Sequence, residues 1–329
     1  MEFKWKTSFT LLNVVLERPI SLDGVEIRTH PRSSPDSPKV SITYRFSTTG
    51  FSPDIHLEAK EAVEKFLDLT IINAALSGCD ERKVMEEFEQ RIENPIELER
   101  AGVNVPIEYS YKELNRSIWN EEYVQSILDW LKKFEAHKDS EIVHRTLRLL
   151  RQSILEEDEY DRLSKAWRSF NALYNHLSGA IQTGEPKKIK NFVSCLHAKN
   201  SSLLKEAIEE YWTPLPKPTR DRGYLPFILV RNNWVSAMDC LVKQNFIHKQ
   251  RTNHSQNLAL AMSKKDLRAA LESALLCVYA ERNRILHGEV ISENERHLLY
   301  ICAAFLQRIV GIALTEFYFF PLQAIQSFS

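Results

Sequence analysis

The sequence contains little glycine and little cysteine. It has nine Gly among 329 residues, and no Gly-rich loop of the kind that cradles phosphates in nucleotide-binding enzymes. The five Cys are scattered and form no CxxC pair, which argues against a zinc ribbon and against a disulfide framework. An odd number of spread, mostly apolar-flanked cysteines suits a reducing compartment. We therefore expect a cytoplasmic protein, and we expect neither a metal ion nor another cofactor.

Long uncharged apolar runs are also missing. Arg308 and Glu316 interrupt the most apolar segment, residues 298–320, so it falls short of the ~20 residues that a membrane-spanning helix needs. The N-terminus has no cleavable small-residue site, and its apolar core is short for a signal peptide. We therefore expect a soluble protein without a membrane partner.

The formal net charge is only −1, which by itself indicates no nucleic-acid partner, but the charge is unevenly distributed. Residues 1–140 have a net charge of −7 and residues 141–329 a net charge of +6. The basic excess lies between residues 187 and 251, where aromatic residues are interleaved with the cations. This pattern is typical of an RNA-facing surface, although ordinary solvated loops would also produce it. The candidate RNA-binding residues are Lys187, Lys188, Lys190, Arg220, Arg222 and Arg231.

The first 118 residues predict a small α+β domain. Period-two alternation of apolar and polar residues is clearest over residues 40–48. The predicted strands are residues 8–17, 25–30 and 40–48, with shorter ones near 102–103 and 107–109. An apolar pattern predicts a helix over residues 57–76, and a highly charged stretch over residues 81–93 is a second helix candidate. No catalytic group of residues stands out in this domain.

From about residue 120 the pattern is helical. Tyr160, Leu163, Trp167, Phe170, Tyr174 and Leu177 recur at alternating spacings of three and four, as expected for a buried helix face. Other helices are predicted over residues 121–137, 141–155, 186–198, 201–211, 227–246, 264–287 (capped by Ser263) and 293–315. The expected fold class is therefore mainly α, with an α+β domain over residues 1–118 and a helical domain over residues 119–329.

The most informative stretch is residues 281–289, at the end of a strongly apolar helical run. Arg282 can neutralise phosphate charge with its fixed fork of donors, and His287 can move protons near neutral pH. Asn283 and His287 are four residues apart and therefore share a helix face. Gly288 predicts that the helix stops directly after the histidine. Together, Arg282, Asn283 and His287 could form a metal-free site for phosphodiester cleavage.

Arg-Asn-x-x-x-His near the end of a helical C-terminal region resembles the signature of the HEPN superfamily. The resemblance implies a HEPN-like helical bundle and a metal-independent ribonuclease that acts as a homodimer. It also implies a role in toxin–antitoxin, antiphage-defence or RNA-processing systems, with RNA and an antitoxin or defence protein as partners. Some members carry a tyrosine two residues after the histidine, which a partner enzyme modifies. Here that position is Glu289, so this type of regulation is not supported.

The expected reaction is RNA cleavage that leaves a 2′,3′-cyclic phosphate, with Arg282, Asn283 and His287 as catalytic residues. Two alternatives stay open. Arg282 could simply cap the last helical turn beside a surface His287, or the domain could be a non-catalytic module that binds RNA, nucleotides or protein. The apolar segment 317–322 offers a dimerisation surface, although the same residues could instead complete the core.

Overall fold

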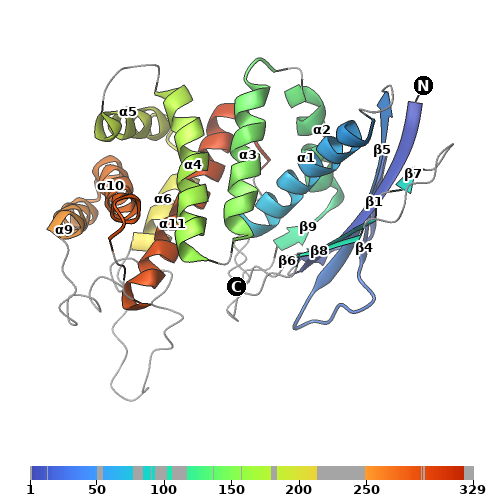
Figure 1. The fold of residues 1–329 in the computed structure, drawn as a ribbon, viewed down its shortest axis with the longest axis horizontal. Coiled ribbons are helices and arrows are strands. Elements are labelled where there is room, and N and C mark those ends of the chain that lie inside the picture. The colour runs from blue at the N-terminus through green and yellow to red at the C-terminus, as the bar shows by residue number, and fades with distance from the viewer. Residues whose placement is uncertain are drawn as a thin grey trace. The chain divides into compact units, whose positions relative to one another are not determined.

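The computed structural model describes two compact units, drawn as ribbons in Figure 1. One unit comprises Met1–Arg151 with Pro321–Ser329, and the other comprises Gln152–Phe320. The residues that the structure describes are 2–12, 14–49, 55–76, 84–89, 91–92, 102–105, 117–135, 137–156, 158–178, 184–212, 249–289, 291 and 293–321.

The first unit is built on an antiparallel sheet with strand order β3-β4-β5-β1-β6-β8, and β7 also pairs with β1. The long strands β1 and β5 pair along their whole length, from Glu2↔Thr49 to Leu12↔Lys39. A separate parallel pair joins β2 to β9. The strands are β1 Glu2–Leu12, β2 Val14–Leu16, β3 Ile20–Leu22, β4 Val25–Thr29, β5 Lys39–Thr49, β6 Val84–Glu89, β7 Arg91–Ile92, β8 Gly102–Val105 and β9 Ser117–Trp119.

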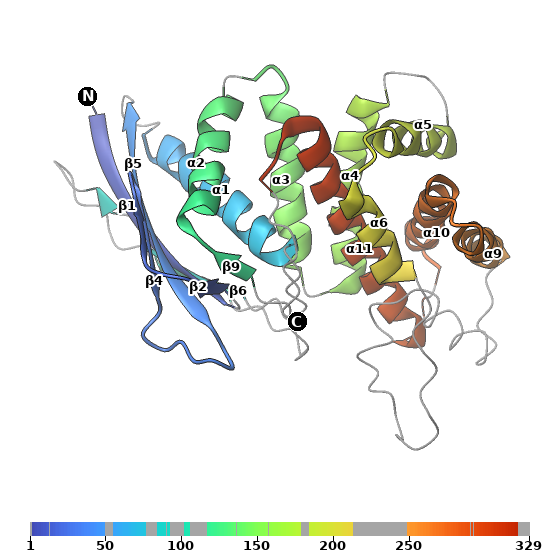
Figure 2. The same cartoon turned by 180° about the vertical axis from the view of Figure 1, so that it is seen from behind.

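Helix α1 (Ile55–Leu76) covers one face of this sheet, as Figure 2 shows from behind. Its Phe66 contacts the ring of Phe9 edge-on at 5.8 Å and stacks on Tyr44 at 4.2 Å. On β1, Phe3, Trp5, Phe9 and Leu11 are buried at alternate positions. Thr7 is buried on the same face, and the even-numbered residues of β1 lie on the opposite face of the sheet.

Two further helices, α2 (Glu121–Glu135) and most of α3 (Ser140–Ile154), belong to the same unit. Buried Asp68 of α1 pairs with Arg151 of α3 at 2.6 Å, which joins these two helices. The first unit therefore includes residues 119–151 as well as the N-terminal sheet, and the domain boundary at residue 118 stays a prediction.

The helix predicted over residues 81–93 is wrong. The structure has strands β6 and β7 there, and Thr10 of β1 pairs with Met85, while Phe88 pairs with Val103 of β8. Charge alone suggested a helix, but the segment has no apolar stripe of helical period. Pairing with two neighbouring strands satisfies its backbone instead. Strand β8 confirms the short strand predicted near residue 102, whereas the strand predicted at residues 107–109 lies outside the described residues.

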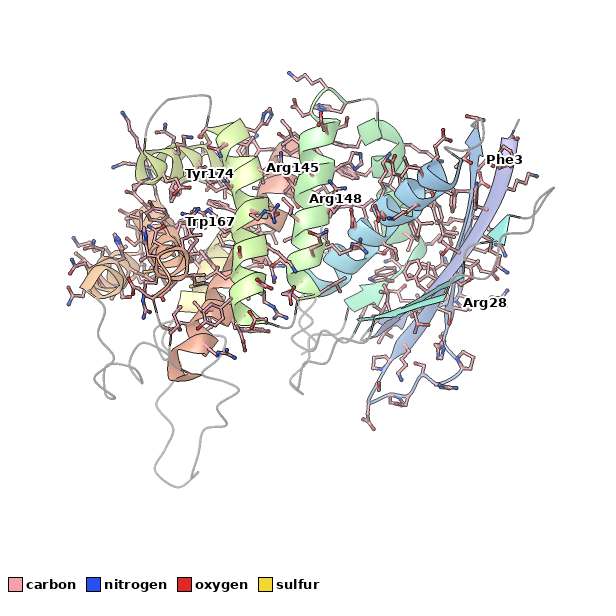
Figure 3. All side chains as sticks on the ribbon, viewed as in Figure 1. Phe3, Arg28, Arg145, Arg148, Trp167 and Tyr174 are labelled. Carbon is pink, nitrogen blue, oxygen red and sulfur yellow. The ribbon has the colours of Figure 1, made fainter. Side chains whose placement is uncertain are left out.

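The second unit is helical. Helix α11 packs against α4, and α10 packs against both α9 and α5. On α4, the predicted stripe is buried at Leu163, Trp167, Phe170 and Tyr174, of which Trp167 and Tyr174 are labelled in Figure 3. The helices are α4 Glu159–Leu177, α5 Glu185–His197, α6 Ser202–Trp212, α9 Lys249–Ser263, α10 Leu267–Leu286 and α11 Glu293–Tyr318. The helix predicted at residues 227–246 lies outside the described residues.

The helix predicted over residues 264–287 is confirmed as α10, which begins three residues later than predicted, at Leu267. Ser263 ends α9 rather than capping the next helix, and its hydroxyl donates to the carbonyl of Leu260 at 2.8 Å. Asp266 is the N-cap of α10, where its carboxylate accepts from the backbone N–H of Ala269 at 2.9 Å. Lys265 between them has a φ of 55°, which is incompatible with a continuous helix.

Helix α11 contains a stretch, Leu298–Tyr318, that is long and apolar enough to span a membrane, but most of it is buried inside the protein. Such burial is typical of a core helix in a soluble protein. At the end of α11, Tyr318 and Phe320 are buried and complete the core, whereas Phe319 between them is 85% exposed. With strands confined to the first unit and helices dominating the described residues, the coarse prediction of a mainly α protein with an N-terminal sheet is confirmed.

Candidate functional site

Helix α10 ends directly at the Arg-Asn-x-x-x-His stretch. His287 is the C-cap residue, and Gly288 follows with a φ of +69°, which residues with a Cβ rarely adopt. The backbone N–H of Gly288 bonds to the carbonyl of Ile285, and that of Glu289 bonds to the carbonyl of Arg284, each at 3.0 Å. This pair of bonds is the Schellman motif, so the predicted helix stop is confirmed. The His287 side chain is exposed at this end.

Arg284 holds the helix end together. It donates to the fully buried Glu281 at 2.9 Å and to the half-exposed Glu289 at 3.0 Å. Since Glu289 lies beyond the helix stop, Arg284 ties the last turn of α10 to the residue that leaves it. The sequence pattern did not single out this arginine, which is buried and has a structural role.

Arg282 lies in a different environment, beside α4 and α5. Its Nη1 donates to the side-chain oxygen of Asn283 at 3.0 Å and lies 3.6 Å from a carboxylate oxygen of Glu185. Its guanidinium also lies over the ring of Trp167, with 5.4 Å between Cζ and the ring centroid. Within the described part of the chain, Nε and Nη2 of Arg282 make no hydrogen bond. Three partners therefore fix the guanidinium while one edge keeps its donors available.

Glu185, the first residue of α5, links this arginine to the core of the unit. One of its carboxylate oxygens faces Arg282, and the other accepts a hydrogen bond from the hydroxyl of Tyr174 at 3.2 Å. Burial of Tyr174, followed by the charge of Glu185 and this hydrogen bond, raises the pKa of the tyrosine. Tyr174 is therefore a neutral donor across the physiological range of pH.

The three predicted catalytic residues are only partly in contact with one another. Arg282 and Asn283 share a hydrogen bond, and Asn283 lies one helical turn before His287. No hydrogen bond, ion pair or ring contact joins the side chain of His287 to another described residue. Its exposed side chain is therefore accessible to a ligand from outside.

The predicted RNA-binding lysines have varied environments on α5. Lys188 donates to the side-chain oxygen of Asn175 at 3.0 Å, and Lys190 pairs with Glu272 at 3.8 Å, while Lys187 is exposed. Only Lys188 is three residues from Glu185 and thus on the same helix face. Arg220, Arg222 and Arg231 lie outside the described residues.

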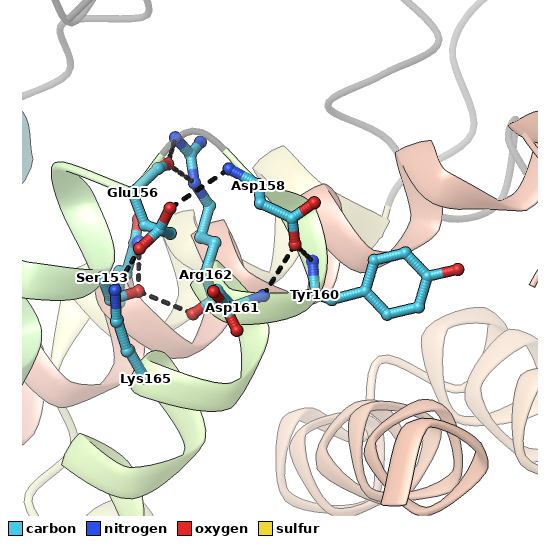
Figure 4. Close-up of polar contacts among 8 residues, drawn as sticks. Ser153, Glu156, Asp158, Tyr160, Asp161, Arg162 and Lys165 are labelled. Atoms are coloured by element: carbon cyan, nitrogen blue, oxygen red, sulfur yellow. Dashed lines mark hydrogen bonds and ion pairs between the residues drawn. The ribbon is translucent and has the colours of Figure 1, made fainter. Parts of the chain in front are cut away.

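The segment that follows the motif is held by Tyr160, near the start of α4. Asp158 caps this helix, because its carboxylate accepts hydrogen bonds from the backbone N–H groups of Tyr160 and Asp161. Figure 4 shows this cluster. The Tyr160 hydroxyl donates to the carbonyl of Ile291 at 3.2 Å. With the bonds of Arg284, this contact holds the residues on both sides of Gly288. The acidic residues near Asp158 therefore belong to a helix start, where they complement the helix dipole.

Sequence reasoning missed Trp167, Tyr174 and Glu185 as neighbours of the motif. Trp167 and Tyr174 were assigned to the core, where they do lie, and nothing in the sequence indicated that one side of this core faces Arg282. Within the described residues, no group of three or more His, Cys, Asp and Glu side chains is placed to hold a metal ion.

Comparison with known proteins gives no identification: no family model matches the chain, and no curated protein or solved structure is significantly similar to it. The HEPN resemblance therefore stays a prediction based on Arg282, Asn283 and His287.

Proposed function

We propose that this protein is a metal-independent endoribonuclease of the HEPN type, with its site at the end of α10. The observation that supports this most is the contrast between two side chains five residues apart. Arg282 is fixed by Trp167, Asn283 and Glu185 yet keeps Nε and Nη2 available, whereas His287 is exposed at a rigid helix end. A fixed cation beside an exposed proton carrier suits catalysis on a phosphodiester.

The proposed reaction begins with attack of the RNA 2′-hydroxyl on the adjacent phosphorus. The 2′-hydroxyl gives its proton to a base, a new O–P bond forms, and the P–O5′ bond breaks. The leaving 5′-oxygen takes a proton from an acid, so the products are a 2′,3′-cyclic phosphate and a 5′-hydroxyl. Arg282 stabilises the extra negative charge on the phosphorane through Nε and Nη2. His287 serves as the base or the acid, and Asn283 orients Arg282 or a phosphate oxygen.

A second copy of the chain would supply the complementary proton carrier, because one imidazole cannot be base and acid on opposite sides of the phosphorus at once. Leu286, next to His287, is 60% exposed and offers an apolar contact close to the site. The resemblance further implies a cytoplasmic effector of a toxin–antitoxin, antiphage or RNA-processing system.

The test is cleavage of mixed-sequence RNA by the purified protein. We expect cleavage that persists in excess EDTA, with 2′,3′-cyclic phosphate ends. His287→Ala should lower the rate ~10²-fold or more, the usual scale for a lost proton-transfer group. The matched control is His197→Ala, because His197 is also an exposed histidine in the last turn of a helix, α5. Loss of cleavage on chelation with recovery in Mg²⁺, or equal effects of both histidine variants, would contradict the proposal.

The shared site has its own test. Arg282→Ala and His287→Ala chains are mixed, so that some dimers hold one intact arginine and one intact histidine. Recovery of cleavage in the mixture supports a site completed by two copies. A chain that sediments as a monomer while it cleaves RNA at full rate rules this arrangement out and leaves the Arg282 and His287 chemistry in place.

The second candidate is a non-catalytic binding module, which the contacts of Arg282 favour. The ion pair with Glu185 and the stacking on Trp167 account for an arginine here without any reaction. A binding module would leave RNA intact, and His287→Ala would not alter its behaviour.

A further inference from the structure

The face of the sheet that points away from α1 has an unusual composition. It alternates with the buried positions on β1, β4 and β5, and Arg28, labelled in Figure 3, lies on it. We call this surface the open sheet face. It comprises Glu2, Lys4, Lys6, Ser8, Glu26, Arg28, Thr43, Arg45 and Ser47.

The cations on the open sheet face outnumber the carboxylates. Glu26 pairs with both Arg28 and Arg45, whose side chains are 71% and 46% exposed. Lys4 and Lys6 have no carboxylate partner among the described residues. The two cations without a carboxylate partner therefore both lie on the central strand β1.

Lys6 lies opposite a cation on the neighbouring strand β5, because its partner in the register of the two strands is Arg45. Like charges directly opposite each other destabilise a sheet, so folding gains nothing from lysine at this position. An anionic ligand on the open sheet face would offset the repulsion between Lys6 and Arg45, and it would account for a lysine at this position.

The remaining side chains of this face indicate the kind of anion. Between the cations lie hydroxyl groups, and those of Ser8 and Thr43 are 3.1 Å apart. The large hydrophobic residues that are exposed elsewhere in the described chain, such as Leu57 and Phe319, are absent from it. A membrane-binding surface or a protein interface would need apolar anchors. Lysine, arginine and hydroxyl side chains together are the usual contacts of nucleic-acid phosphates.

We propose that the open sheet face binds the phosphate backbone of a nucleic acid without reading its sequence. It has no exposed aromatic ring on which bases could stack, so the contacts are with phosphates alone. The proposal does not depend on the ribonuclease proposal, because a non-cleaving protein would bind through this face equally well.

The test uses the full chain and a fluorescein-labelled single-stranded DNA of mixed sequence. DNA lacks the 2′-hydroxyl, so the proposed cleavage reaction cannot consume the probe. Anisotropy gives the association constant between about 50 and 200 mM salt. Each phosphate contact adds about 0.7 to the steepness of log K against log salt, so Lys4→Ala/Lys6→Ala should lower the steepness by about 1.4. At the lowest salt it should weaken binding about tenfold or more.

The matched control is Lys132→Ala/Lys133→Ala, which removes the same charge from two exposed positions on α2. It should keep the steepness of the intact protein. Equal losses in the two double variants would overturn the proposal, because they would reflect net charge alone. Binding of the intact protein to phosphatidylserine vesicles, with none to the oligonucleotide, would also overturn it. Melting curves check that both variants stay folded.

Discussion

The end of α10 and the open sheet face differ in whether their cations have carboxylate partners. At the end of α10, Arg284 is held by Glu281 and Glu289, and Arg282 by Glu185. On the open sheet face, Lys4 and Lys6 have no carboxylate partner among the described residues, and Lys6 lies opposite Arg45. A paired cation can be explained by stability or positioning. Lys6 and the exposed His287 are the side chains to which our two proposals assign a ligand.

The largest expected effect comes from breaking the most buried ion pair among the described residues. Arg284→Ala would remove the cation that pairs with the fully buried carboxylate of Glu281. Breaking a buried ion pair by removing one partner costs about 3–5 kcal/mol of unfolding free energy. Urea unfolding measures this loss. Glu281→Gln/Arg284→Met should recover part of it, because neither residue then carries a buried charge.

Arg282→Ala is the comparison for that experiment. Arg282 retains 24% of its side-chain exposure, and its ion pair with Glu185 spans 3.6 Å. Weak pairs and a cation–π contact contribute about 1 kcal/mol together, so this variant should stay folded. If Arg282→Ala destabilised the protein as much as Arg284→Ala, the distinction between a catalytic and a structural arginine would fail.

A second effect concerns pH. The folded-state pKa of Tyr174 is raised by burial, by the charge of Glu185 and by their hydrogen bond. The stabilisation is therefore fully present below the ordinary tyrosine pKa of about 10, and it is lost as the pH rises from there toward the raised value. One proton changes the unfolding free energy by at most about 1.4 kcal/mol per pH unit. Above pH ~10, the unfolding free energy of Tyr174→Phe should fall less steeply with pH than that of the intact protein. Equal slopes in the two proteins would contradict the raised pKa of Tyr174.

Much of the fold followed from the sequence because apolar period and turn residues are local signals. The alternation in β5, the stripe on α4 and the stop at Gly288 were all predictable. The strands at residues 84–92 were not, because their pairing with β1 depends on residues far apart in the sequence. Charge gave the wrong local signal there.

The site was predictable in part for the same reason. Arg282, Asn283 and His287 lie within six residues, so their shared helix end could be inferred. Glu185 and Trp167 come from other helices, and only packing brings them to Arg282. The position of Lys6 opposite Arg45 likewise depends on the register of β1 and β5, which no local pattern reveals.

The smallest expected effect is a gain in stability rather than a loss. Lys6→Thr should raise the unfolding free energy by roughly 0.2–1 kcal/mol, because it removes a like-charge pair with Arg45 and introduces a residue that favours strands. Lys4→Thr is the matched control, since Lys4 lies opposite the neutral Ser47 and has no such repulsion to lose. Thermal or urea unfolding of both variants measures the difference. A Lys6 variant that gains stability while it loses oligonucleotide binding marks a residue kept for a ligand rather than for the fold. A Lys6→Thr protein less stable than Lys4→Thr would show that Lys6 supports the sheet, and the contrast between the two regions would then disappear.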